Sequence, residues 1–456
     1  MVLEFQTVEF QPVVKPILRY QEKFFPIQRN PIVVLQNLLE VGLVSHYVMY
    51  EGKNEVRIAA NELAKVSISQ DYVSLETIDN QYSEPISDPF KQVERLLGSL
   101  MIQNWTAYGY IGFDIARFYS SYSKAIEQNL LYFFIPEIEL KFTKEGVYVK
   151  STKSIEQVRE ILLIDSQLPD FKSIAPKVNI ESKIYQQSVQ TLINAIHQGD
   201  LHKAIISRSL KMTGDLDVLG TYTVAGKANN SARSYCLKLG DVSAVGFSPE
   251  TLIEVYEDAS VVTNPLAGTR PRGKTLEEDK YLMNELFTDA KEVKEHALSV
   301  LLAQSEIASI CLPGSVKVYN FMEVKKYRCV QHLSSKVGGN LKPGNTLWDG
   351  LKVLFPGVTV SGIDKEKALE WIDKLENEPR GIYAGCIGWV DSNGTTDLAI
   401  AIRSVYQYGN CISLNAGAGI VAESVPEREY IESVNKMNTM LANLVFKSEI
   451  NMNNCK

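Results

Sequence analysis

The sequence predicts an α+β protein with long antiparallel β segments and helices kept apart from them. Strand-like apolar runs occur at residues 202–212, in hairpin order through 234–268, and again through 382–421. Helical periodicity is confined to segments of its own. In chain order, these helical segments are 90–101, 154–165, 182–200, 275–307 and 425–445. A doubly wound protein would instead alternate strand and helix throughout.

The length and the net charge of the chain limit the number of domains and the kinds of partner. The chain has 456 residues, which suggests about three domains or one large unit. Its net charge is −7 and no basic tract stands out, so we expect no nucleic-acid partner. A polar, Pro-containing stretch at 166–182 is the best candidate boundary. It divides an N-terminal part, 1–180, from a second part, 181–456, and we expect both to form one intertwined domain.

Targeting signals are not evident. The first ten residues lack the basic start and apolar run of a signal peptide, and no stretch of about 18 uncharged apolar residues could span a membrane. The six cysteines form no C-x-x-C pair, which argues against a zinc site or a redox motif. We therefore expect a protein of the reducing cytoplasm without a membrane partner.

A phosphate-loop pattern occurs at residues 268–275, where Gly268, Gly273 and Lys274 match G-x-x-x-x-G-K-[ST]. Pro271 removes a backbone N–H from a loop whose function is to point N–H groups at phosphates. Arg270 and Arg272 add bulk where such a loop must wrap closely. We reject nucleotide binding here; a basic surface turn is the simpler interpretation.

Two helical segments each carry a Glu-x-x-Glu pair. Glu292 and Glu295 form the first pair, and Glu429 and Glu432 the second. Spacing of three places both carboxylates of a pair on one helix face. Brought together, two such faces would suit Mg²⁺, although most pairs of this kind are solvated surface.

Features next to these pairs favour a site. Gly417 and Gly419 precede the second pair and would let backbone N–H groups approach a small anion. Lys436 follows Glu432 by one helical turn and places a cation beside the carboxylates.

Single polar residues interrupt several apolar strands. Lys203 shares a strand face with Ile205 and Ser207, and Arg403 ends the run 397–403. Taken alone, each is more simply an edge side chain reaching water, and the same holds for Tyr383. His332 could be a hydrogen-bonded core histidine, and Glu250 a turn residue after Pro249.

Ten ordered segments together resemble the chorismate-utilising enzymes, which include anthranilate, aminodeoxychorismate, isochorismate and salicylate synthases. The resemblance spans residues 180–445 and is weak before them. The segments are 202–208, 246–252, 265–273, 289–300, 330–335, 355–363, 379–390, 398–404, 415–424 and 426–437.

The details look most like salicylate synthases. Residues 313–337, followed by 355–363, resemble that subfamily, and Lys203 stands where amine-inserting members carry another residue. Pro271 and Arg272 depart from the Ala and apolar residue common there. The resemblance implies two antiparallel sheets with helices packed outside, and an N-terminal third that completes this unit.

The resemblance also implies a chemistry. Chorismate would bind with its ring carboxylate at a Mg²⁺ held by the four glutamates, Glu295 and Glu432 foremost. Arg403, Tyr383 and the Gly419 N–H would hold the enolpyruvyl carboxylate. The remaining predicted substrate-binding residues are Gly268, Thr269, Gly417 and Lys436.

In the first step, water attacks ring C2 and the C4 hydroxyl leaves, with Lys203 as the base and Glu250 as the acid. Thr269 would help to place that hydroxyl. In the second step isochorismate loses pyruvate and becomes salicylate, in a pocket completed by His332.

Alternatives remain open at this stage. The same residues would serve an isochorismate synthase that stops after the first step. An amine-inserting synthase is disfavoured by Lys203, and a non-catalytic paralogue by the filled site positions. Siderophore supply is expected by analogy only, and the protein could be a monomer or a homodimer.

Overall fold

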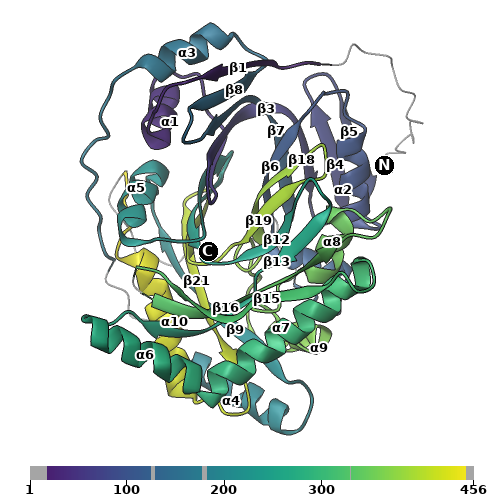
Figure 1. Cartoon of the computed structure of the whole chain (residues 1–456), viewed down its shortest axis with the longest axis vertical. Coiled ribbons are helices and arrows are strands. Elements are labelled where there is room, and N and C mark those ends of the chain that lie inside the picture. The colour runs from purple at the N-terminus through teal and green to yellow at the C-terminus, as the bar shows by residue number, and fades with distance from the viewer. Residues whose placement is uncertain (1–17, 125–128, 177–181, 329, 448–456) are drawn as a thin grey trace, which may run out of the picture.

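The computed structural model describes residues 18–124, 129–176, 182–328 and 330–447 (Figure 1). The predicted boundary at 166–182 lies partly outside these ranges. The first ten residues, on which the expected absence of a signal peptide depends, lie wholly outside them. In the described part of the chain, no helix is both long and apolar enough to cross a membrane.

The fold is α+β, as the sequence predicts, with a large antiparallel β core. Its 21 described strands are joined by pairing, and the ladders between these strands run antiparallel. The strands are β1 (Gln21–Phe25), β2 (Tyr47–Glu51), β3 (Val56–Ile68), β4 (Tyr72–Thr77), β5 (Gln81–Pro85), β6 (Thr106–Ile111), β7 (Leu131–Phe142), β8 (Val147–Ser151), β9 (Lys203–Thr213), β10 (Arg233–Leu239), β11 (Val242–Ser248), β12 (Thr251–Val255), β13 (Ser260–Thr263), β14 (Leu266–Pro271), β15 (Lys317–Lys326), β16 (Val330–Asn340), β17 (Gly362–Ile363), β18 (Cys386–Asp391), β19 (Thr396–Ile400), β20 (Ser404–Tyr408) and β21 (Cys411–Ile420).

The helices pack on the outside of the strands (Figure 1). One apolar cluster lies under α1, α3 and α5, and a larger one lies under α2, α4, α7, α8 and α9. The helices are α1 (Pro31–Glu40), α2 (Pro89–Gly98), α3 (Ile155–Leu163), α4 (Lys183–His197), α5 (Val218–Ala228), α6 (Leu276–Thr288), α7 (Ala290–Ile310), α8 (Leu347–Leu354), α9 (Lys365–Leu375) and α10 (Pro426–Leu441), with a 3-10 helix at Phe113–Phe118.

The helix predicted over 275–307 is wrong as one continuous element. It is two helices, α6 and α7, because Asp289 ends the first and caps the second. The Asp289 carboxylate accepts hydrogen bonds from the backbone N–H groups of Lys291 and Glu292, which leaves the Asp289 backbone extended. This break turns α7 so that Glu292 and Glu295 are buried.

Strands from before and after residue 180 pair with one another. β2 pairs with β10, and β6 pairs with β18. The β9–β21 ladder holds the centre of the second part, with Ala204 opposite Ile420 and Ser207 opposite Gly417. This register brings the start of β9 beside the two predicted anion-binding glycines.

One buried ion pair ties three segments around this centre. Arg380 donates to both carboxylate oxygens of Glu376, at 2.9 and 2.6 Å. The same guanidinium donates to the carbonyls of Val360 and Ile205, at 2.7 and 2.6 Å. Glu376 in turn accepts from the N–H and hydroxyl of Ser207. Because every partner is satisfied, the pair fixes β9 and the turn at 357–361 relative to each other.

Candidate active site

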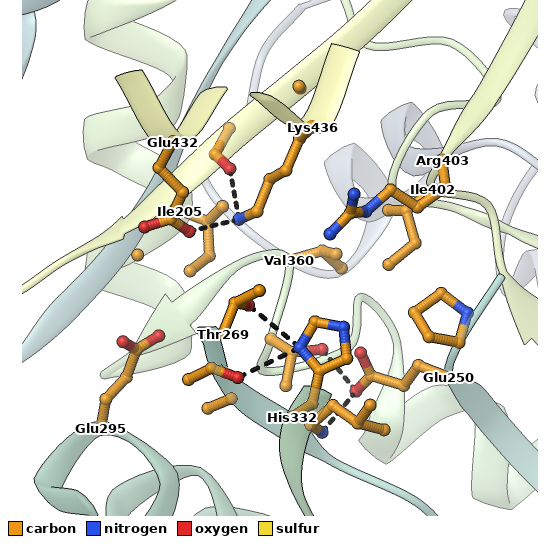
Figure 2. Close-up of a pocket in the computed structure, with 18 of the residues that line it drawn as sticks. Ile205, Glu250, Thr269, Glu295, His332, Val360, Ile402, Arg403, Glu432 and Lys436 are labelled. Atoms are coloured by element: carbon orange, nitrogen blue, oxygen red, sulfur yellow. Dashed lines mark hydrogen bonds and ion pairs between the residues drawn. The ribbon is translucent and has the colours of Figure 1, made fainter. Parts of the chain in front are cut away.

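A cavity of about 790 Å³, including space open to solvent at its mouth, lies where β9, β14, β16 and β21 meet α7 and α10. Glu432 and Glu295 lie on one side of it, and Arg403 and Glu250 on the other (Figure 2). His332 and Thr269 lie between them. The cavity therefore has carboxylates at one end and a guanidinium at the other.

β14 and β16 present Thr269 and His332 to the cavity from opposite register positions. His332 Nδ1 lies 3.1 Å from the carbonyl of Gly268 and 3.0 Å from Thr269 Oγ1. Since a carbonyl only accepts, Nδ1 carries the hydrogen and Nε2 keeps a lone pair; within the described residues Nε2 is buried without a partner. Burial, with help from the charge of Arg403, lowers the pKa of His332 to about 3, so this ring is neutral.

Glu250 lies in the turn between β11 and β12 and is almost fully buried. Its Oε1 accepts from Thr359 Oγ1 at 2.6 Å and from the Leu266 N–H at 3.3 Å. Burial raises the pKa of Glu250 to about 8, although these two hydrogen bonds and the charge of Lys203 oppose the shift. The side chain therefore keeps its proton at neutral pH, as a general acid must.

Lys203 begins β9 and its side chain is fully buried. Its Nζ lies 2.9 Å from Glu295 Oε1 and 3.1 Å from Ser299 Oγ. The amine thus lies behind Glu295 and does not line the cavity in this structure. The charge of Lys203 nevertheless acts to lower the pKa of Glu250.

Each of the four predicted metal-binding glutamates has a cation of this chain beside it. The ion pairs are Glu292–Arg270 at 3.4 Å, Glu295–Lys203 at 2.9 Å, Glu429–Lys291 at 2.8 Å and Glu432–Lys436 at 2.7 Å. In residues 18–447 as described, no three His, Cys, Asp or Glu side chains converge as metal ligands would.

Burial and neighbouring charges shift the pKa values of three of these carboxyl groups. Burial, together with the charges of Glu295 and Glu432, raises the pKa of Glu292 to about 7. Burial also raises the pKa of Glu429, whose Oε2 is buried with no partner among the described residues. Burial opposes ionisation of Glu432, yet Lys436 and Lys291 bring its pKa below the ordinary value. Four carboxylates are thus crowded beside four cations, and burial disfavours the charged forms of Glu292 and Glu429.

The opposite end of the cavity offers an unpaired cation. Arg403 lies between β19 and β20 with φ of 54°, and no carboxylate among the described residues pairs with it. The apolar run 397–403 does not continue as one strand, since β19 ends at Ile400 and β20 begins at Ser404. The guanidinium of Arg403 points into the cavity from this break (Figure 2). Tyr383 lies beside it, buried, with its pKa raised to about 12 by desolvation.

Glycines are required where β21 passes the carboxylates. A Cβ at Gly419 would collide with Glu295 Oε1, and one at Gly417 would lie 2.5 Å from the carbonyl of Ile206. Lys436 Nζ donates to the Gly417 carbonyl at 2.8 Å, which fixes α10 against this strand. Both glycines line the cavity, as predicted.

All the predicted site residues line this one cavity except Lys203 and Glu429. Lys203 is joined to the lining residue Glu295 by an ion pair, and Glu429 pairs with Lys291, which directly precedes the lining residue Glu292. The sequence analysis missed Thr359, Lys291 and Ser299. Lys291 directly precedes Glu292, and Thr359 lies in the family segment 355–363, so each had a usable signal. Rejection of the phosphate loop is confirmed, because residues 266–271 form strand β14.

Comparisons with known proteins agree with this geometry. The family model for chorismate binding enzymes matches residues 45–442. The chain belongs to this family of chorismate-utilising enzymes. It is 33% identical over 405 residues to a salicylate synthase of Mycolicibacterium paratuberculosis, covering 88% of this chain and 90% of that protein.

Solved structures of the family share the fold. Anthranilate synthase component I of Streptococcus pneumoniae matches with a TM-score of 0.74 at 30% identity, covering 85% of this chain and 92% of that one. The menaquinone-specific isochorismate synthase of Escherichia coli matches with a TM-score of 0.72 at 20% identity, covering 93% and 94%. The second likeness shows the fold alone. This chorismate-utilising enzyme thus has relatives of more than one activity.

Arg403 is the cation best suited to a carboxylate of chorismate. We expect Arg403→Met to raise KM for chorismate by about 100-fold, because a desolvated cation–carboxylate pair is lost. Arg403→Lys should lie in between, since lysine lacks the planar fork of donors. The measurement is steady-state chorismate consumption.

Lys274→Met is the control for Arg403→Met, because Lys274 is exposed and lies outside the cavity. Its KM should equal that of the wild type. An unchanged KM in Arg403→Met would show that chorismate does not use this guanidinium.

Proposed function

We propose that this chorismate-utilising enzyme is a Mg²⁺-dependent salicylate synthase. The observation that carries the acid–base part of the proposal is a buried amine, Lys203, whose charge acts on a buried acid, Glu250. One-third identity to a salicylate synthase over nearly the whole chain supports the same choice.

The first step needs a base and an acid at once. Water bonds to ring C2 and gives its proton to Lys203, while the C4–O bond breaks and Glu250 protonates the leaving oxygen. Lys203 must first leave Glu295, with which it pairs in this structure. Glu250 suits its role because it is protonated at neutral pH.

The donor set fits a magnesium ion. Glu292, Glu295, Glu429 and Glu432 offer oxygen ligands from two helices. Among the described residues, Glu429 Oε2 is buried without a hydrogen-bond partner and is free to accept a cation. Glu295 and Glu432 line the cavity and would hold the ion. When bound, Mg²⁺ would neutralise and orient the ring carboxylate.

The second step needs the substrate held in one conformation and does not need a base. A pericyclic transfer moves hydrogen from C2 to the enolpyruvyl methylene as the ether C–O bond breaks, which yields pyruvate and salicylate. Arg403 and Tyr383 would clamp the side chain near that geometry. His332 is neutral, so it would line the pocket and offer the lone pair of Nε2, but it would not donate a proton from that atom.

An isochorismate synthase is the second candidate, because the same acid and base would serve it. It would accumulate isochorismate and release no pyruvate. Siderophore supply, a cytoplasmic location and the oligomeric state remain predictions from the sequence.

Lys203→Gln separates the two steps. We expect loss of isochorismate formation from chorismate by at least about 100-fold, because the base is gone. Conversion of supplied isochorismate to salicylate should stay within a few-fold of wild type, because that step uses no base. Both rates are measured by chromatography of the products.

Lys211→Gln is the matched control on the same strand, where Lys211 pairs with Glu378 outside the cavity. Equal loss of both steps in Lys203→Gln would remove Lys203 from the role of first-step base.

Metal dependence has its own test. After chelation with EDTA, added Mg²⁺ should restore chorismate consumption, and Glu432→Gln should weaken the apparent Mg²⁺ affinity by about 10- to 100-fold. Glu427→Gln, an exposed change on the same helix, is the control and should bind Mg²⁺ as the wild type does. Full activity in EDTA would contradict the proposed metal site.

A further inference from the structure

We propose that Thr359 is a positioning residue that determines which oxygen of Glu250 carries the acidic proton. The proposal rests on the proposed function, in which Glu250 is the general acid. It concerns a hydroxyl that has no chemistry of its own in the reaction and acts only through its neighbour.

Two donors meet the same oxygen of Glu250. The Thr359 hydroxyl donates to Oε1 at 2.6 Å, and the Leu266 N–H donates to Oε1 at 3.3 Å. Figure 2 shows both dashed lines ending on one oxygen, while the other lies on the side of Val360 and Arg403. Because Oε1 already accepts two hydrogen bonds, the proton of the neutral acid sits on Oε2.

Thr359 is held rigidly enough to impose this choice. It lies in the turn after α8, where the Gly357 carbonyl accepts from the N–H groups of Val360 and Ser361, at 3.0 and 2.9 Å. Arg380 holds the Val360 carbonyl from behind, at 2.7 Å. A hydroxyl on so constrained a turn is aimed before substrate arrives.

The charged and titratable groups around Glu250 do not provide an alternative anchor. Lys203 on β9 and Lys325 on β15 act on it through charge only, and Tyr327 donates to the Pro249 carbonyl instead. His332 on β16 is occupied by Gly268 and Thr269. Among these side chains, the Thr359 hydroxyl is the one that touches the Glu250 carboxyl.

The position of the proton matters for the balance of the first step. The proton on Glu250 Oε2 passes to the C4 oxygen as the C4–O bond breaks, and the leaving group departs as water. The attacking water has meanwhile bonded to C2 and given a proton to Lys203. One water enters and one leaves, so the acid works only if its proton faces C4.

Thr359→Val keeps the size of the side chain and removes the hydroxyl. We expect kcat to fall by about 10- to 100-fold with KM within about twofold, because the carboxyl can rotate its proton away. The hydroxyl also favours the ionised form of Glu250, whose pKa is about 8. Without it, the pH at which activity is lost on the basic side should move upward, by about one unit.

An infrared titration measures the same proton without turnover. The C=O band of protonated Glu250 is found by subtracting the spectrum of Glu250→Gln. Its midpoint should rise in Thr359→Val and stay at the wild-type value in Thr359→Ser, which keeps the hydroxyl. The Thr359→Ser variant should also keep kcat within about threefold.

Two results would overturn the proposal: a midpoint that does not move in Thr359→Val, or an equal shift in Thr359→Ser. The second would mean that Thr359 acts only as a wall of the cavity. A wild-type enzyme that makes neither isochorismate nor salicylate overturns the proposed function instead. The infrared midpoint still decides whether Thr359 controls the proton of Glu250.

Discussion

The buried carboxylates around the cavity are tolerated because each has a cation of the same chain beside it, and this pairing dictates how strands and helices meet. The four cations come from β9, β14, α7 and α10, so these elements must converge before any glutamate is stabilised. An ionised carboxylate buried without such a partner would cost several kcal/mol. The same balance leaves no spare positive charge at this end for a dianionic substrate.

This constraint links metal binding to the chemistry. Glu295 cannot neutralise Lys203 and ligate an ion through the same oxygen. In this structure Lys203 is paired with Glu295, whereas a Glu295 turned to a cation would leave the amine with Ser299 alone. Under the proposed function, metal binding and the release of Lys203 from its ion pair are therefore coupled through Glu295.

Much of the site was predictable because it depends on local periodicity. Spacing of three predicted that Glu292 and Glu295 share a face. Strand alternation placed Lys203 on a face with Ile205 and Ser207, but alone it favoured an edge side chain, and the structure buries Lys203 instead. The ordered motifs of the family then joined residues that are far apart in sequence. The sequence marked Arg403 as the end of an apolar run, but it did not predict the positive φ of this residue.

The features that the sequence did not predict are mostly contacts between distant segments. The choice of Lys291 for Glu429, and of Thr359 for Glu250, is made by packing between segments more than 100 residues apart. The break at Asp289 was locally coded, since aspartate is a strong N-cap, but a continuous helical pattern on both sides concealed it. Local signals therefore gave the two acidic helices, and the resemblance implied roles for Lys203 and Glu250, but neither identified the residues that contact these side chains.

The most direct test of the central claim is a chromatographic analysis of products from chorismate and Mg²⁺ at neutral pH, with ammonium salt present as a competing nucleophile. The account predicts salicylate and pyruvate in equal amounts, whether or not ammonium is added. Anthranilate would contradict it, because the site would then admit an amine where Lys203 and Glu250 are expected to activate water.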